Sequence, residues 1–416
     1  EVGTTTFRPP FTATRMVAIA HHRQKDLYAP RRLMPAHEDH TRHGAEFEDF
    51  GWQRPDWYGC NGADREIAVT AEIKAVREAI GVFDASPLGK IEVAGPDARD
   101  FLNKFYVSNL ATLKPGRIRY SVMCHDDGII FDDGVVTCID DNLFLAGPTS
   151  GNAEAVAAWF ERWRQTEWPG MRVAIAPVTS NWAACALAGP GARDLLALLS
   201  PDFDISKEAF PNMHYREGTV KGVPARVARV SFTGELQYEV SVPARYGMAL
   251  MQTAMRAGTE LGATRIGMEA WLRLRLEKGY LHLGSDTNGR TTPFDIGMGR
   301  IVARKQADFL GKRALTLPFN RSENREELVG LKPIGAPIRI GGRILSDGHD
   351  KVPCPTIGNV TSACDSPSAG NIAMALIENG SKRMGDRVKI YAEGQITEAE
   401  ICSPVFVDPE NERLRA

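Results

Sequence analysis

The chain has 416 residues, of which 43% are hydrophobic and 25% are charged, an ordinary composition for a globular protein of two or three domains. Its formal net charge of −2 gives no electrostatic reason to expect nucleic acid or an anionic membrane surface as a partner. No apolar run approaches the roughly 20 residues of a membrane-spanning helix, so no membrane association is predicted.

Residues 1–65 are rich in Pro, His, Trp and Arg and show little periodicity. We expect an irregular N-terminal arm that wraps over another surface instead of forming its own core. The start, EVGTTTFRPPF, has no secretory h-region and no initiator Met, which indicates a processed chain or a part of a longer one. The cysteines, seven in all, contain no CxxC pair, which favours reduced thiols in a cytosolic or matrix compartment, with the cytoplasm preferred, over a disulfide framework or cysteine-bound zinc.

Regular structure is expected from a helical pattern near 65–80 onward, and the motif A-G-P-x-A-R-D-x-L then occurs twice. It lies in KIEVAGPDARDFLNKF (90–105) and in WAACALAGPGARDLLALL (182–199), 94 residues apart. Each copy predicts a strand, a glycine turn, a proline at the first helical position and an amphipathic helix. The repeat predicts two related α+β lobes within residues 66–318, and a cleft between such lobes is a natural ligand site. For the Gly-Pro residues themselves, a reused scaffold turn is the preferred explanation.

The stretch GIIFDDGVV, residues 128–136, places two adjacent carboxylates inside a run that is typical of a buried strand. Successive side chains of a strand point to opposite faces, so Asp132 and Asp133 cannot do the same job. Burying a lone carboxylate costs several kcal/mol or shifts its pKa. At least one of the two therefore needs a partner or a ligand.

The remaining elements follow from local patterns. Strands are predicted around 227–231 and 239–242, and a long helix near 269–278. From residue 328 onward, short strand-like runs separated by Gly and Pro predict a small all-β domain over residues 325–416.

Several motifs in one order carry a family resemblance. YSVMCHDDGIIFDDGVV (120–136), SFTGELQYEV (231–240), LRLEKGYLHLGSDTNGRTTPFDIG (274–297) and GNVTSACDSPSAGNIAMALI (358–377) resemble the glycine-cleavage T-protein family of tetrahydrofolate-dependent aminomethyltransferases. TTFRPPF, GNAEAVAAWFERWRQTEWP (151–169) and SPVFVDPENERL (403–414) resemble the C-terminal half of the α-subunits of heterotetrameric sarcosine oxidase. The resemblance implies an α+β, T-protein-like fold of three lobes, two of them related and one a C-terminal β-barrel, around a tetrahydrofolate site. No GxGxxG precedes a helix at the start, so the upstream nucleotide-binding half of those α-subunits is not expected within this sequence; either the chain is a separate subunit or only this portion was made.

The resemblance also implies roles for particular residues. Asp133 would face the folate, where a fixed carboxylate can hold folate nitrogens, stabilise developing positive charge and relay a proton. Asp132 is expected to cap a turn or to meet solvent on the other face. Glu239 would accept the paired N–H donors of the pteridine edge, and Glu235 is expected to be structural. A turn-forming Asp pair before Gly134, and an outward-facing strand carboxylate at Glu239, remain the alternatives.

Aromatic and basic residues complete the expected folate contacts. Tyr120 and Phe232 would pack on the folate rings, although Tyr120 could equally be a core tyrosine. Trp271 stands where the family has an arginine, and Arg275, close by on the same helix, is the candidate cofactor ligand in its place. Pro148 and Thr149 replace the family's Asn-Ala, which favours a role like that of sarcosine oxidase over that of a free-standing T-protein.

The resemblance implies capture of the methylene unit of oxidised sarcosine, or of a similar N-methyl amino acid, as 5,10-methylenetetrahydrofolate. The flavin (FAD or FMN) would lie on a partner subunit, because no motif here could hold it alone. The spacing of His37, His40 and His43 gives no shared helical face in a Pro-flanked loop, so we expect these residues to line that interface and not to bind metal. A stand-alone aminomethyltransferase and a non-catalytic assembly subunit are the alternatives, and His125 and His282 have no assigned role.

Overall fold

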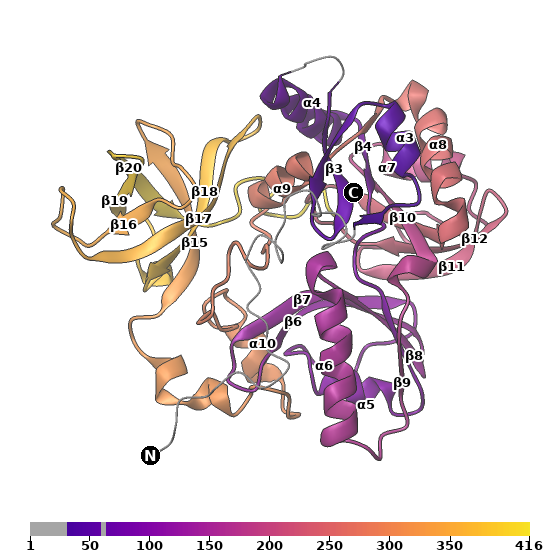
Figure 1. Cartoon of the computed structure of the whole chain (residues 1–416), viewed down its shortest axis with the longest axis horizontal. Coiled ribbons are helices and arrows are strands. Elements are labelled where there is room, and N and C mark those ends of the chain that lie inside the picture. The colour runs from indigo at the N-terminus through magenta and orange to yellow at the C-terminus, as the bar shows by residue number, and fades with distance from the viewer. Residues whose placement is uncertain (1–30, 60–63) are drawn as a thin grey trace, which may run out of the picture.

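The computed structural model describes residues 31–59 and 64–416. It contains one 11-stranded sheet and a closed barrel of six strands (Figure 1), which confirms the predicted α+β class with a C-terminal barrel. The strands of the sheet are β4 (Ile80–Asp84), β5 (Ile91–Ala94), β6 (Arg117–Cys124), β7 (Ile130–Asp140), β8 (Leu143–Pro148), β9 (Ala174–Pro177), β10 (Trp182–Ala188), β11 (His214–Val220), β12 (Val223–Arg229), β13 (Gln237–Pro243) and β14 (Ala263–Arg265). The helices are α3 (His37–Arg42), α4 (Arg65–Glu78), α5 (Ala98–Asn103), α6 (Ala153–Thr166), α7 (Ala192–Leu198), α8 (Gly247–Ala257), α9 (Met268–Glu277) and α10 (Gly299–Arg304).

The large sheet consists of two related halves, β14-β4-β10-β13-β12-β11 and β6-β7-β8-β5-β9, joined between β11 and β6. Ile91 pairs with Ala146 between β5 and β8, and Cys185 pairs with Val240 between β10 and β13. Both partners of the second pair follow those of the first by 94 positions, and α8 likewise starts 94 positions after α6. The duplication predicted from the repeated motif is therefore present in the strand register of the two lobes.

The repeated motif forms the same turn in both lobes. Gly95 has φ +133° and Gly189 has φ +130°. A Cβ atom at these positions would lie 2.1 Å from the carbonyl oxygen of Arg172 and 2.4 Å from that of Ala79, so only glycine fits either turn. The helices α5 and α7 begin two residues after the prolines of the motif, because the turn continues past each proline. The prediction that proline occupies the first helical position is therefore wrong.

Helices α5 to α8 cover one face of the sheet, which we call the outer face. Val136 and Phe144 pack with α5 and α6 in one lobe, and Tyr238 and Val240 pack with α7 and α8 in the other. Neighbouring side chains of each strand point the opposite way, toward the inner face. There, a small apolar cluster around Ile118, with Tyr215, Val230, Val135 and Ala228, crosses the junction of the two lobes.

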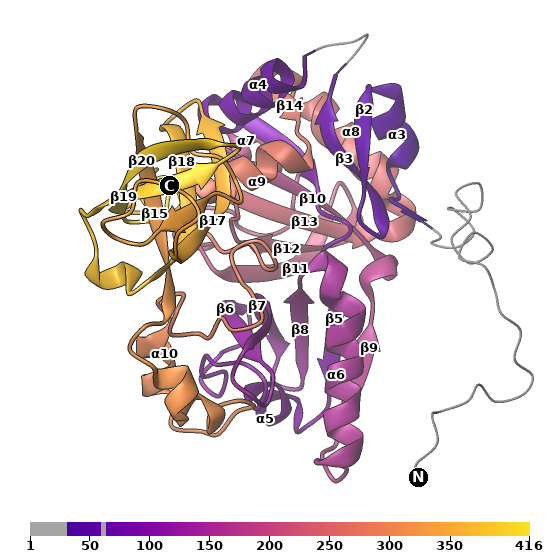
Figure 2. The same cartoon turned by 60° about the vertical axis from the view of Figure 1, so that its left-hand side comes forward.

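The C-terminal barrel packs against the inner side of the sheet through α9. It consists of β15 (Glu326–Ile334), β16 (Arg343–Leu345), β17 (Thr356–Ser366), β18 (Gly370–Glu378), β19 (Arg387–Ala392) and β20 (Gln395–Cys402). Leu276 of α9 packs against Ile372 and Met374 of the barrel. In both views α9 lies between the barrel and the large sheet (Figures 1 and 2).

Residues 32–58, which were expected to be irregular, contain α3 and a separate sheet. That sheet has the order β1-β3-β2, with β1 (Arg32–Leu33), β2 (Ala45–Asp49) and β3 (Trp52–Tyr58). Its strands are short, and β2 and β3 pair with a register shift, which is why the sequence shows no clear alternation. The prediction of an irregular arm is wrong for this segment, and the earlier residues lie outside the described part. The domain bounds at 65, 318 and 325 stay predictions.

Two further observations concern the described residues. The cysteines within them, from Cys124 to Cys402, are all free thiols, and Cys60 lies outside the described part. No helix in residues 31–59 and 64–416 combines the length and the apolarity needed to cross a bilayer.

Candidate functional site

Asp133 and Glu239, from different lobes, point to the same inner face. Residues directly opposite each other in an antiparallel pair share a face. Glu239 lies opposite Ala228, which belongs to the inner apolar cluster, and Asp133 is two positions from Val135 of the same cluster. The sheet register therefore places both carboxylates, together with Tyr120 opposite Val135, over one continuous surface.

Asp133 is hydrogen-bonded by two hydroxyl groups. The Tyr120 hydroxyl donates to Oδ2 at 2.8 Å, and Thr149 Oγ1 donates to Oδ1 at 3.3 Å. Burial raises the pKa of Asp133 to about 6 against the effect of these bonds. Asp133 as a residue is nevertheless only half-buried, and Tyr120 is 39% exposed. The pair is thus enclosed by protein on most sides while one side stays open to a ligand.

Asp132 lies on the opposite face of β7 from Asp133 and Tyr120. It is fully buried and accepts hydrogen bonds from Thr149 N and Asn152 Nδ2, both at 3.2 Å. Burial, followed by the charge of Asp133, raises its pKa. The expectation that it meets solvent is wrong, because this face of β7 is covered by the start of α6. Its role is to fix the turn that carries Thr149.

Glu239 forms no ion pair with any residue in the part of the chain that the structure describes, but the charge of Lys90 acts on it. Burial raises the pKa of Glu239 to about 7, and the positive charge of Lys90 acts in the opposite direction. The hydrogen bond from Gln237 Nε2 is long, at 3.5 Å. Lys90 is buried, and sequence reasoning missed it. The repeat contained a signal that could have drawn attention to Lys90. The equivalent position in the second copy, 94 residues later, is Ala184, so the repeated turn itself does not require a lysine.

Residues 85–90 link the two lobes that carry the carboxylates. This link leaves β4 in one lobe and enters β5 in the other. Gly89 N donates to the carbonyl oxygen of Pro148 at 3.1 Å, directly before Thr149, and a Cβ at Gly89 would lie 2.7 Å from the same oxygen. The link thus carries Lys90, whose Nζ donates to the carbonyls of Ser86 and Leu88, while its glycine contacts the turn that binds Asp133.

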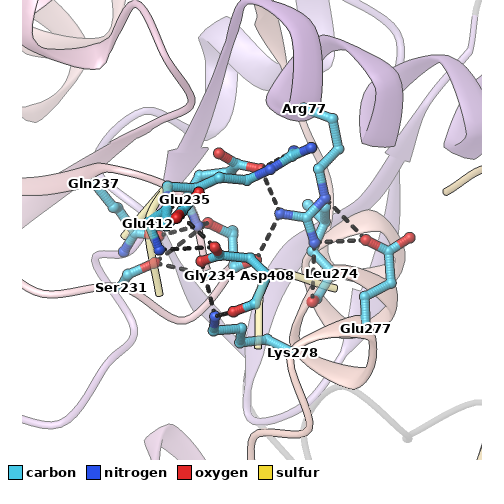
Figure 3. A network of polar contacts seen from close by, with 12 residues as sticks. Arg77, Ser231, Gly234, Glu235, Gln237, Leu274, Glu277, Lys278, Asp408 and Glu412 are labelled. Carbon is cyan, nitrogen blue, oxygen red and sulfur yellow. Dashed lines mark hydrogen bonds and ion pairs between the residues drawn. The ribbon is translucent and has the colours of Figure 1, made fainter. Parts of the chain in front are cut away.

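The loop before Glu239 is fixed by a network of ion pairs (Figure 3). Arg77 of α4 binds Glu235 at 2.7 Å and Glu277 at 2.5 Å, and Arg413 also binds Glu235, at 2.8 Å. Gly234 has φ +82°, and a Cβ there would lie 2.7 Å from the Lys278 side chain. Glu235 is therefore structural, as expected, and the network fixes the loop that precedes Glu239.

Comparison with known proteins decides the family. The family model of the GCVT N-terminal domain matches residues 36–306, and that of the glycine cleavage T-protein C-terminal barrel domain matches residues 327–408. The chain belongs to the glycine-cleavage T-protein family. This confirms the predicted family and fold, and it places the chain in a family of folate-dependent enzymes.

Individual relatives extend the comparison. The sarcosine oxidase subunit alpha of Corynebacterium sp. (strain U-96) is 40% identical over 99% of this chain, but the match covers 43% of that protein; the chain therefore spans less than half its length. The aminomethyltransferase of Halothermothrix orenii is 32% identical over 90% of this chain and 99% of its own. The solved glycine cleavage system aminomethyltransferase T from Bartonella henselae has a TM-score of 0.79 at 28% identity, covering 91% of this chain and 98% of that one.

Two positions that are polar in the T-protein family's motifs form an aromatic stack here. Trp271 lies parallel to Phe83, with ring centroids 4.3 Å apart, and Phe232 also stacks with Trp271, with ring centroids 5.9 Å apart. The alanines 184, 186 and 188 of β10 leave room for these rings in the same core. Phe232, which stays partly exposed, is therefore positioned by Trp271 and not by a hydroxyl hydrogen bond.

Arg275, the predicted basic ligand, is used for structure in this T-protein family member. It is 3% exposed and binds Asp286 at 2.5 Å and Ser362 Oγ at 2.7 Å. These contacts tie α9 to the barrel and leave the guanidinium no exposed face. Asp286 follows the helix by nine residues and Ser362 lies in the barrel, so the sequence could not reveal this pairing. We do not include Arg275 in the site.

The histidine cluster forms part of a helix, not a loop. His37 packs on Phe47, with ring centroids 4.7 Å apart, and His43 binds the Asp39 carbonyl at 2.7 Å. His40 is fully buried and binds Asp84, so it does not line an exposed interface as expected. The three rings therefore have different partners. No group of three or more possible ligands able to hold a metal ion occurs among the described residues.

The other two unassigned histidines have local partners. His125 packs against Phe131 and Trp159, with centroids 4.5 and 5.3 Å apart. His282 Nδ1 lies 2.9 Å from Ser285 Oγ, and burial lowers its pKa to about 4. Both are accounted for by these contacts.

Proposed function

We propose that this chain binds tetrahydrofolate on the inner face, between Asp133 and Glu239, and transfers a one-carbon unit to it. The observation that carries the proposal is the pair of carboxylates from different lobes, both partly exposed yet enclosed, on one face of the sheet. Membership of the T-protein family and the sequence motifs around both residues support a reduced folate as the ligand.

The proposed contacts follow from the chemistry of each side chain. The Glu239 carboxylate accepts two adjacent N–H donors of the pterin edge, which fixes the orientation of the ring. Tyr120 offers an open ring face for packing, and Phe232 offers a second one from the other lobe. No described cation forms an ion pair with Asp133, so its charge is free to act on the ligand.

Asp133 performs the electrostatic and proton-transfer part of the reaction. Tetrahydrofolate supplies the amine nitrogens that receive the one-carbon unit. The carboxylate lies where positive charge develops as such an amine attacks, and it stabilises that charge most strongly in a site enclosed by protein. With its pKa near 6, Asp133 is ionised at neutral pH and still able to take up a proton and pass it on.

We further propose that the one-carbon unit comes from an N-methyl amino acid such as sarcosine, oxidised on a flavin-bearing partner subunit. The 40% identity to a sarcosine oxidase subunit alpha over 99% of the chain supports this source, as do Trp271 and Thr149 at positions that differ from the T-protein motifs. The product would be 5,10-methylenetetrahydrofolate, formed within a hetero-oligomer. The cytoplasmic location remains a prediction.

Anaerobic titration calorimetry with tetrahydrofolate tests the proposal. We expect binding by the wild type, and affinity reduced by about 10- to 100-fold in Asp133→Asn and Glu239→Gln, the range for a lost hydrogen bond to a charged group. Asp141→Asn, an 80% exposed carboxylate of the same lobe, is the matched control and should bind normally. No binding by the wild type would refute the proposal and favour a non-catalytic assembly subunit.

A stand-alone aminomethyltransferase is the second candidate, because the match to the Halothermothrix orenii aminomethyltransferase covers 99% of that protein. It predicts activity of the isolated chain with an aminomethyl-lipoyl carrier and no flavoprotein that co-purifies. The sarcosine-oxidase-type proposal predicts the reverse of both results.

A further inference from the structure

The N-terminal segment, residues 32–58, is anchored to the lobe that contains β4, β10 and β13. His40 of this segment binds Asp84 of β4 at 2.8 Å, and Tyr58 N donates to Glu72 of α4, the helix that packs on β4, at 2.7 Å. Both His40 and Glu72 are buried. Figure 2 shows β2 and β3 beside α3 and α8 and, in that view, above α6. The segment is therefore fixed to one lobe by buried polar contacts.

One side chain of this segment, Phe50, reaches the other lobe. A Cβ at Gly151 would lie 2.4 Å from Phe50 Cε1 and 3.0 Å from its Cζ, so the ring packs directly on the main chain of the glycine. Gly151 belongs to the short turn Ser150–Asn152 before α6, and it does not have the positive φ that favours glycine. The glycine at this position thus leaves room for the ring and is not required by its own backbone conformation.

The Phe50 ring has a defined position although it is 51% exposed. The guanidinium of Arg54 lies over it, with Cζ 4.6 Å from the ring centroid, which is a cation–π contact. Arg54 in turn forms an ion pair with Glu48 at 2.6 Å. Arg32 of the same sheet binds Glu154 at the start of α6. The N-terminal sheet therefore contacts the start of α6 at two points.

The turn that this ring contacts binds both aspartates of β7. Thr149 N and Asn152 Nδ2 each donate to Asp132 at 3.2 Å, and Thr149 Oγ1 donates to Asp133 at 3.3 Å. Asn152 N donates to the Thr149 carbonyl oxygen at 3.0 Å and closes the turn. Gly151 lies between these two donor residues. A displacement of Gly151 would therefore move the groups that hold the Asp133 carboxylate.

We propose that Phe50 is a positioning residue of the ligand site: packed on Gly151, it holds the turn that binds Asp133 in place from the opposite lobe. Because the N-terminal segment is anchored to the lobe of Glu239, this contact sets the position of one carboxylate relative to the other. A ligand that spans both lobes then meets two carboxylates at a fixed separation. The choice of folate as that ligand rests on the proposed function, but the contact belongs to the chain itself.

The test is a double-variant cycle on the full chain, with tetrahydrofolate affinity measured anaerobically. Phe50→Ala removes the ring and leaves the turn unsupported, whereas Gly151→Ala places a methyl group where the ring lies. Each single variant should weaken binding by about three- to tenfold, the range expected for residues that act through direct contact. The double variant should bind more tightly than Gly151→Ala alone, because the methyl group then occupies the space of the lost ring. Losses that simply multiply would overturn the inference.

Further variants distinguish positioning from a general structural role. Phe50→Leu keeps an apolar side chain on Gly151 and should retain most of the affinity. In the Asp133→Asn background, Phe50→Ala should have little further effect, and a full additional loss would overturn the inference. Phe319→Ala is the matched control, because Phe319 is 63% exposed and also lies under an arginine, with Arg325 Cζ 6.0 Å from its ring centroid. It should bind as the wild type does.

A second measurement separates this inference from the proposed function. Hydrogen exchange of the Thr149 and Asn152 amides reports on the turn without any ligand. Exchange should be faster in Phe50→Ala than in the wild type and unchanged in Phe319→Ala. If the wild type fails to bind tetrahydrofolate but Phe50→Ala still speeds this exchange, the ligand is wrong and the positioning role stands. If exchange at both amides is the same in Phe50→Ala and the wild type, the positioning role is refuted.

Discussion

Replacement of Tyr120 by phenylalanine should change the protonation of Asp133 and little else. The substitution keeps the ring that would pack on the ligand and removes the hydroxyl that donates to Asp133 Oδ2 at 2.8 Å. A hydrogen bond to a charged group contributes about 1.5–3 kcal/mol, which corresponds to roughly one to two pKa units. The bond favours the ionised form, so its loss should raise the pKa of Asp133 from about 6 toward neutrality or above.

The assay is the pH dependence of folate-dependent one-carbon capture, in which Asp133 acts as the ionised base. In the wild type, activity should decline as the pH falls through about 6, and in Tyr120→Phe the same decline should occur about one unit higher. Thr149→Val, which removes the longer bond of 3.3 Å, should give a smaller shift in the same direction. An acidic limb at the same pH in all three proteins, with rates reduced equally, would refute the reasoning.

Two predictions concern stability. Asp286→Ala leaves Arg275 buried without its charge partner and should lower the free energy of unfolding by about 3–5 kcal/mol. The control Asp347→Ala removes a carboxylate from the surface pair with Arg383 and should lower it by less than about 1 kcal/mol. Urea unfolding followed by circular dichroism distinguishes the two variants, and equal midpoints would contradict the structural role of Arg275. Asp133→Asn should stabilise the ligand-free protein at pH 7.5 by about 1 kcal/mol. A raised pKa means that the folded state binds more protons than the unfolded state between about pH 4 and 6, so the charge of Asp133 lowers stability above that range. The stability gained in Asp133→Asn should therefore vanish at pH 4, and a gain that persists there would contradict this account.

Periodicity and motifs predicted the elements that depend on local sequence. The strand at GIIFDDGVV, the helices near 65–80 and 269–278 and the barrel all form where they were expected, because each is determined by alternation, helical spacing or turn residues within a few positions. The repeat gave more, since two copies of one motif at a fixed separation predicted the paired lobes. Tyr120 and Asp133 were also predicted, and their side chains meet because the hairpin register puts Tyr120 opposite Val135, two positions from Asp133 on the same face.

The errors concern contacts between segments far apart in the chain. Arg275 was expected to meet a ligand, but its partners Asp286 and Ser362 come from a loop and from the barrel. Of the two alternatives for Asp132, the turn agrees with its bond from Thr149 N, whereas contact with solvent is wrong because the start of α6 covers it. His40 was assigned to an interface, yet Asp84 binds it in the interior.

The sequence by itself determined the fold class, the duplicated lobes and the acidic residues on which the proposed site depends, because motif order and strand alternation are written along the chain. The tertiary structure alone decided which of the charged groups are free to act. Whether a carboxylate or a guanidinium is available to a ligand depends on the counter-charges and hydrogen-bond donors that folding brings beside it. Glu239 forms no ion pair among the described residues, whereas Asp286 binds Arg275 directly.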